Sequence, residues 1–389
     1  MLRNFFKKTA ALAVASALII SSVSPASAWM NYADKFYQVT EKLHQAGNET
    51  ETITIMVAGD LMCQRMQQTK AYDGHNYNFK PSFKYVKRIF SEADYVIGNL
   101  ETMVSKSFPL VKDMTYVQKR ASLNAPAEYL DALKYAGFDG LVLANNHCCD
   151  LGPVGIRETL EVLNKKGFEH TGLFASQEDT RYLLTDIDGF KIGFLSYAKY
   201  FNEKEHFLTQ EEQSYMLNPI DEETVKADIK ALREAGAEYV IVYSHCGTEY
   251  SQGPSLRQKK FAQMYADAGA DYVIGSHPHV LQRAGMVYSE DREVPVLFSM
   301  GNFASSMGGS NSITKETIVL SITLRRTLNG EVTLKEHTYY PCYILDEYNG
   351  DSFVIMPESK KYNGGYNASE TVQTAFKHIK KIVGTKYFS

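Results

Sequence analysis

Five apolar runs of the chain each end in residues of the types that bind metal ions, and this repetition constrains the fold most. Runs of this kind, rich in β-branched residues and closed by glycine or polar residues, are typical of short buried strands. The runs at 53–58, 93–98, 136–144, 235–243 and 270–275 lead into Asp60, Glu101, Asn146 with His147, His245, and His277 with His279. Because sites in open α/β sheets form at the carboxyl ends of strands, the pattern predicts that these residues meet at one sheet edge.

Helix signals lie between several of these runs. Pro126 and Pro153 each open an amphipathic segment that ends at a glycine, and such alternation of helix and strand is typical of a largely parallel sheet. The turn dipeptides 188–189 and 329–330 predict antiparallel hairpins. We therefore expect the α/β class, with two packed mixed sheets in a sandwich flanked by helices.

The sequence also suggests how this domain is bounded. Residues 29–51 have the pattern of a short amphipathic helix, and residues 52–345 are expected to form the domain. Residues 346–368 are rich in Gly, Asn and Ser and are expected to be irregular. Ser369 is placed to cap a final helix in the C-terminal segment, which extends to residue 389. The apolar stripe of this helix would pack on the domain.

The first 28 residues have the composition of a secretory signal peptide. Arg3, Lys7 and Lys8 precede an apolar run at 9–23, and Ala-Ser-Ala at 26–28 fits a cleavage site. We therefore expect an exported protein, secreted or held at the cell surface, that touches a membrane only if this segment stays uncleaved. The formal charge of −4 disfavours a nucleic-acid partner, because such proteins are usually basic.

Cysteine usage leaves two interpretations open. The five cysteines are Cys63, Cys148, Cys149, Cys246 and Cys342, and an odd number leaves at least one unpaired within the chain. We favour small buried residues beside the site; a disulfide or a thiolate near a metal is the alternative. The adjacent pair at 148–149 is not expected to bond, because the ring would be strained.

The residues at the strand ends form a donor set suited to a divalent metal. Two carboxylates, an amide oxygen and several imidazoles fit one or two ions of Mn, Fe or Zn, whereas Mg and Ca prefer oxygen ligands. Two ions sharing a carboxylate can activate a water. His147 would donate a proton to a leaving group, and Arg65 would bind an anionic substrate oxygen.

Each residue alone also has a structural explanation. An aspartate after glycine is often a turn residue, Glu101 could cap the next segment, and Asn146 is a common turn residue. A single histidine is more often structural, and Arg65 more often makes a surface ion pair. These explanations weaken together, because four of the ten histidines lie at three matching strand ends.

Six ordered motifs resemble those of the CapA family, whose members are named for poly-γ-glutamate capsule biosynthesis and resemble calcineurin-like metallophosphoesterases. The likeness covers about residues 52–305. The motifs are Gly59–Arg65, Gly98–Glu101, Ala144–His147 with Asp150 and Gly152, His245–Tyr250, Gly275–His279 and Ser299–Phe303.

The resemblance implies a two-metal site within a metallophosphoesterase-like sandwich. Asp60 and His279 would bind one ion, Asn146, His245 and His277 the other, and Glu101 would bridge them, with His147 as the acid. The superfamily's Asp-x-His motif has Met62 at its histidine. Because a thioether is a poor ligand for such ions, we expect the first site to be weaker. Cys246 replaces the family's usual aromatic residue.

Two functions remain open at this point. One is a secreted bacterial hydrolase of a phosphoester or related anionic substrate. The other is a non-catalytic subunit of capsule production that binds an anionic polymer such as poly-γ-glutamate and works with membrane proteins of capsule synthesis. Intact His147 favours the first, and Met62 favours the second. A purely structural metal site is a weaker third reading, because structural sites are usually closed by four ligands.

Overall fold

The computed structural model describes residues 51–113, 122–290, 292–308 and 312–388. The expected signal peptide at 1–28 and nearly all of the expected helix at 29–51 lie outside the described residues. Among the described residues, Glu51 and 326–330 belong to one unit, and the larger unit lies within 52–325 and 331–388. Within the described ranges, no helix is both long and apolar enough to cross a membrane.

The first sheet of the larger unit has eight strands. Its order is β14-β13-β12-β1-β2-β3-β4, and β11 pairs with β1. Strands β1, β2, β3 and β4 run parallel to one another, and β11 is parallel to β1. Strand β12 is antiparallel to β1, and β13 is antiparallel to β14. The strands are β1 (Thr52–Leu61), β2 (Tyr95–Leu100), β3 (Gly140–Val142), β4 (Glu169–Thr171), β11 (Asn302–Ala304), β12 (Glu316–Arg326), β13 (Val332–Tyr348) and β14 (Asp351–Pro357).

The second sheet has six strands in the order β5-β6-β7-β8-β10-β9. Its centre is parallel from β6 to β10, and an antiparallel strand lies at each edge. The strands are β5 (Leu183–Ile187), β6 (Phe190–Ala198), β7 (Tyr239–His245), β8 (Tyr272–Ser276), β9 (Ala284–Ser289) and β10 (Arg292–Leu297). Both sheets therefore contain parallel strands whose carboxyl ends can carry site residues.

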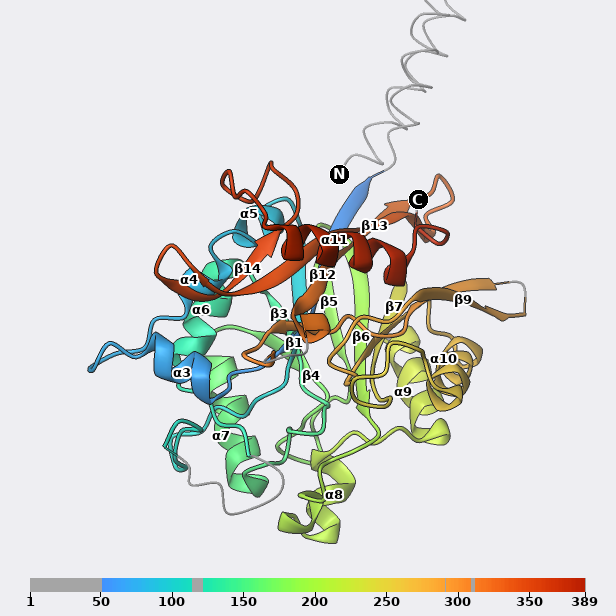
Figure 1. Cartoon of the computed structure of the whole chain (residues 1–389). Helices are drawn as coiled ribbons and strands as arrows, with labels where there is room; N and C mark the ends of the chain where they lie inside the picture. Colours follow the sequence, from blue (N-terminus) through green and yellow to red (C-terminus); the bar gives the residue numbers. More distant parts are fainter. Residues whose placement is uncertain (1–50, 114–121, 291, 309–311, 389) are drawn as a thin grey trace, which may run out of the picture. The chain divides into compact units, whose positions relative to one another are not determined.

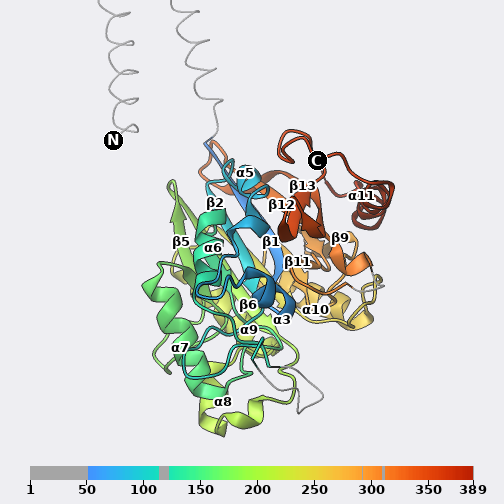
Figure 2. The ribbon, with the colours of Figure 1, turned by 60° about the vertical axis from the view of Figure 1, so that its left-hand side comes forward.

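Helices cover the outer sides of the two sheets. Figure 1 and Figure 2 show α6 (Glu128–Ala136) and α7 (Gly152–Lys165) on one side, and α9 (Glu222–Glu234) and α10 (Leu256–Ala268) on the other. Buried residues of β1, β2, β7 and β8 form a core between the sheets. Buried residues of α11 (Glu370–Val383) belong to the same core. The shorter helices are α3 (Arg65–Ala71), α4 (Lys80–Phe83), α5 (Lys87–Phe90) and α8 (Gln210–Met216). The predicted α/β sandwich with mixed sheets is confirmed.

The hairpin predicted at 188–189 is confirmed. β5 and β6 pair antiparallel across Asp188 and Gly189, whose φ angles of 48° and 86° are those of a hairpin turn. The expectation of an irregular 346–368 segment was wrong in part, because β14 lies inside it and pairs with an extended β13. Strand β9 was also not predicted from the sequence. Cross-strand pairing stabilises both segments despite their weak strand signals.

All five cysteines are buried and unpaired. This agrees with the interpretation that they fill small spaces in the core. Burial raises the pKa of the Cys246 thiol to about 11, so this thiol is protonated and inert at neutral pH.

Candidate metal centre

The predicted residues come together, but the expectation of a single sheet edge was wrong, because they follow the carboxyl ends of strands from both sheets. Asp60 lies near the end of β1, Glu101 directly follows β2, and His245 is the last residue of β7. The loop after β8 carries His277 and His279, whose φ angles of 96° and 57° are unusual for residues other than glycine. One ligand atom each of Asp60, Glu101 and His279 lies within 4.8 Å of the other two.

Glu101 is the central residue of this cluster. Its side chain is fully buried, and neither carboxylate oxygen has a hydrogen-bond partner among the described residues. Oε1 lies 3.8 Å from His245 Nε2 and 3.9 Å from His279 Nε2. Burial, followed by the nearby Asp60 carboxylate, raises the pKa of Glu101 well above its ordinary value. A buried carboxylate without donors is costly, so its surroundings suit a cation.

Asp60 is held by an asparagine that the sequence analysis left without a role. Asn99 Nδ2 donates to Asp60 Oδ1 at 2.8 Å and lies 3.3 Å from His245 Nδ1. Burial raises the pKa of Asp60, while His279, 3.7 Å away, lowers it. Asn99 therefore links the first sheet to the second at the site. Its place between Gly98 and Glu101 in a repeated strand-end motif was the signal available.

Burial holds two imidazoles of the site, His245 and His277, in their neutral form. Burial, followed by the neighbouring imidazoles His279 and His147, lowers the pKa of His277 to about 3. Burial also lowers the pKa of His245 well below its ordinary value. His245 Nε2 lies 2.9 Å from Asn146 Oδ1, and the buried His277 Nδ1 has no hydrogen-bond partner among the described residues. Neutral imidazole is the form that binds metals.

Two further residues orient the histidines without having been predicted to do so. Ser276 Oγ lies 2.7 Å from His245 Nδ1, and Asn302 Oδ1 lies 2.9 Å from His279 Nδ1. Such partners fix which ring nitrogen faces a metal. Asn302 belongs to the quoted motif at 299–303, but its role depends on the pairing of β11 with β1, which the sequence does not reveal.

His147 is held by a buried carboxylate at the edge of the same cluster. Its Nδ1 lies 2.7 Å from Asp150 Oδ2, which also accepts the Leu123 amide at 2.6 Å. Lys204 Nζ lies 3.7 Å from Asp150 Oδ1. This arrangement leaves Nε2 of His147 as the nitrogen able to exchange a proton with a bound molecule.

A cavity of about 650 Å³ opens beside these residues. Asn146, His147, His277 and His279 line it, and Met62 contributes to its wall. Arg65 begins α3 and is half-buried; its neighbour Gln64 lines the cavity, whereas Arg65 is not among the lining residues. The structure therefore brings six predicted ligands and His147 together and leaves Arg65 at the margin.

Met62 lies in apolar surroundings. It is 2% exposed and clusters with Val111 and Leu123, with Met307 packed against them. The side chain at the position of the expected histidine therefore belongs to an apolar part of the cavity wall.

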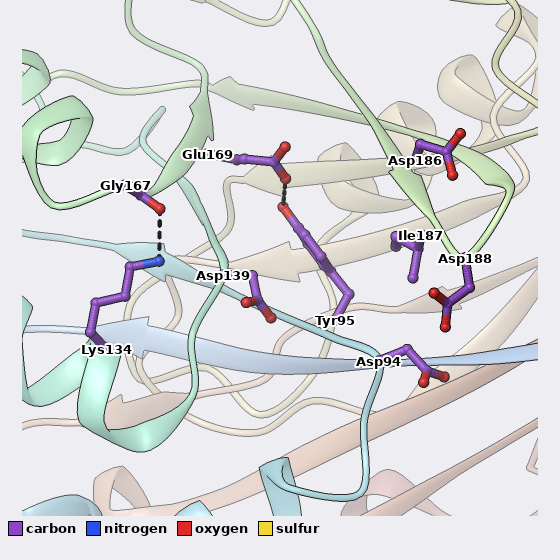
Figure 3. A pocket seen from close by; sticks show the side chains of 9 residues that line it. All are labelled: Asp94, Tyr95, Lys134, Asp139, Gly167, Glu169, Asp186, Ile187 and Asp188. Carbon is purple, nitrogen blue, oxygen red and sulfur yellow. Dashed lines mark hydrogen bonds between the residues drawn. The ribbon is translucent and has the colours of Figure 1, made fainter.

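A second hollow of about 360 Å³ is acidic but internally satisfied. Figure 3 shows Tyr95 Oη donating to Glu169 Oε2 at 2.7 Å and Lys134 Nζ donating to Gly167 O at 2.8 Å. Asp139 Oδ2 accepts the Val96 amide at 2.9 Å. These contacts tie strands and loops together, and none of the predicted site residues lines this hollow.

Two mixed sheets that share a buried carboxylate–imidazole cluster define an α/β protein with a candidate metal centre. The chain belongs to the family of bacterial capsule synthesis proteins PGA_cap, whose sequence profile matches residues 54–307. It is 29% identical over 314 residues to the capsule biosynthesis protein CapA of Bacillus anthracis, covering 79% of this chain and 71% of that protein. It is 31% identical over 255 residues to the PGA biosynthesis protein CapA of Bacillus subtilis (strain 168), covering 64% and 63%. The resemblance to the CapA family is confirmed.

Solved structures give a weaker likeness. The calcineurin-like phosphoesterase YfkN of Bacillus subtilis is 12% identical with a TM-score of 0.43, covering 85% of this chain and 97% of that chain. A putative 5′-nucleotidase of Staphylococcus aureus is 12% identical with a TM-score of 0.45, covering 85% and 58%. The fold follows from the strand order and pairing of the two sheets.

Proposed function

We propose that this protein is a metal-dependent hydrolase of a phosphoester or related anionic substrate, acting outside the cytoplasm in capsule or envelope polymer production. The observation that carries the proposal is the buried carboxylate of Glu101, which has no hydrogen-bond partner among the described residues and lies among imidazoles. A cation would compensate that buried charge. The anionic polymer of the poly-γ-glutamate type and membrane proteins of capsule synthesis are the proposed partners.

The donor set fits one or two divalent ions of Mn, Fe or Zn. Asp60, Glu101 and His279 would hold one ion, and Asn146, His245 and His277, together with Glu101, would hold the other. Such ions would supply positive charge that polarises a substrate oxygen and lowers the pKa of a water.

The chain's own residues would handle the proton. Asp150 fixes Nδ1 of His147, so the opposite ring nitrogen would deliver a proton to the leaving oxygen. His147 lines the cavity, where it would meet substrate without being a ligand. Arg65, near the cavity margin, is proposed to attract an anionic substrate through its charge.

The experiment compares three alanine variants of the exported protein. His147→Ala should keep bound metal and lose about 10²–10⁴-fold in rate on phosphomonoesters or phosphodiesters. His245→Ala should lose metal and activity together. His75→Ala, an exposed histidine, is the matched control and should behave as the parent. A parent protein that binds metal but turns over neither substrate class with any metal tried would refute hydrolysis.

A second candidate function is favoured by the apolar surroundings of Met62. In this alternative, an incomplete metal site binds poly-γ-glutamate without catalysis. His147→Ala should then leave polymer binding unchanged, whereas His245→Ala and Arg65→Ala should weaken it. Export itself is tested by N-terminal sequencing of the mature protein, which should begin at Trp29; a start at Met1 would refute cleavage of the signal segment.

A further inference from the structure

One loop of the second sheet contacts three parts of the candidate metal centre. The loop, Lys199–Lys204, follows β6 and is called here the β6 loop. Its alternate residues each meet a different site residue. The Tyr200 ring lies 5.4 Å from the His277 ring, Asn146 Nδ2 donates to Asn202 Oδ1 at 3.3 Å, and Lys204 Nζ lies 3.7 Å from the Asp150 carboxylate that holds His147.

The backbone of the β6 loop is held in an unusual conformation. Asn202 and Glu203 are consecutive residues with φ angles of 56° and 59°, a region that residues other than glycine seldom adopt, although asparagine tolerates it. The loop is tied at both ends, because the Lys199 amide donates to His245 O at 3.0 Å and Lys204 is only 4% exposed. Strained backbone of this kind persists where the surroundings fix it, often at functional sites.

The contact with Asn146 matters because an amide can face a metal in two ways. Only Oδ1 can bind a cation, whereas Nδ2 would repel it. In the structure, Oδ1 pairs with His245 Nε2 at 2.9 Å, and Nδ2 donates to Asn202. A His245 that binds a cation through Nε2 carries no proton there and no longer donates to Asn146. The Asn202 contact is then the hydrogen bond that keeps Oδ1 directed at the site.

We propose that Asn202 is a positioning residue that selects the metal-binding orientation of Asn146. This proposal rests on the metal site proposed above. It adds that a residue of the β6 loop, which supplies no ligand itself, is needed for tight metal binding. A hydrogen-bond partner of this kind is typically worth about 10–100-fold in metal affinity.

The test is isothermal titration of the full-length mature protein with Mn²⁺ and with Zn²⁺. Asn202→Gly removes the amide and keeps the left-handed backbone, and its affinity should fall about 10–100-fold. Asn202→Asp offers only acceptors to Asn146 Nδ2, so its affinity should equal or exceed that of the parent. Glu203→Gly is the matched control for backbone change at the neighbouring position and should bind as the parent does. Thermal unfolding shows that each variant is folded.

The outcomes separate this proposal from the proposed function. Parent-like affinity in folded Asn202→Gly, or equal losses in the Gly and Asp variants, would overturn the positioning role and leave the metal site standing. A parent protein that binds neither cation would overturn the metal site and the positioning role together. These outcomes are measured by metal titration and thermal unfolding, so an absence of hydrolase activity does not affect them.

Discussion

Replacing Met62 by histidine should exchange stability for metal affinity. The side chain is 2% exposed and packs with Val111 and Leu123. Burying a methionine contributes about 1.5–3 kcal/mol, and most of this is lost when an imidazole replaces it. The backbone should stay in place, because Gln67 Nε2 and Tyr129 Oη donate to Met62 O at 3.0 and 2.9 Å. The shift in Tm is about 2–4 °C per kcal/mol for domains of 150–250 residues and smaller for larger ones. At about 1–2 °C per kcal/mol, Tm without metal should fall by roughly 2–6 °C.

Metal should reverse this loss. The new imidazole would join Asp60 and His279, the side predicted to be weaker, and a direct ligand should exceed the ~10–100-fold effect of an orienting partner. A 100-fold gain corresponds to about 2.7 kcal/mol, which matches the packing loss. Met62→His should therefore be less stable than the parent without metal and close to it with saturating Mn²⁺.

Calorimetric titration and thermal unfolding, each with and without Mn²⁺, measure both effects. The parent should show one tight and one weak or absent binding step, and Met62→His should tighten the weak step. Met62→Leu is the matched control: it keeps the apolar volume, should cost less than about 1.5 kcal/mol, and should gain no affinity. Two equally tight steps in the parent, or an unchanged weak step in Met62→His, would refute the reasoning.

Two further predictions concern packing and pH. A Cβ on Gly275 would lie 2.0 Å from Phe298 O, so Gly275→Ala should separate β8 from β10 and lower the free energy of unfolding, measured with denaturant, by about 3 kcal/mol or more. A Cβ on Gly253 meets nothing within 4 Å, so in the control Gly253→Ala this free energy should stay within about 0.5 kcal/mol of the parent. Equal stability of the two variants would contradict this account. Burial lowers the pKa of His337. Below about pH 6.5 the unfolded chain therefore binds a proton at this residue that the folded chain does not bind. The free energy of unfolding should then fall as pH drops from 7 toward 5. In His337→Gln the slope of unfolding free energy against pH should be smaller than in the parent, by at most about 1.4 kcal/mol per pH unit. Identical slopes in the two proteins would show that His337 is not responsible.

Much of the fold could be predicted because its signals are local. Apolar runs closed by ligand-type residues indicated β1, β2, β7 and β8, and a turn dipeptide indicated the β5–β6 hairpin. Parallel strands place their carboxyl ends at one edge, so Asp60 and Glu101 could be expected to meet before any distance was known. His245 ends a strand of the other sheet, and its approach to them depends on how the two sheets pack.

Tertiary structure decided which residues hold that site in place. Asn99 between Asp60 and His245, and Asn202 against Asn146, come from segments that approach each other only when the two sheets pack. Strands β9 and β14 likewise depend on pairing partners, since cross-strand contacts stabilise segments with weak signals of their own. The sequence by itself determined the ligand types at the strand ends, because side-chain chemistry and strand periodicity are local. Their orientation and their burial were decided by contacts between residues distant in the chain, which no local pattern encodes.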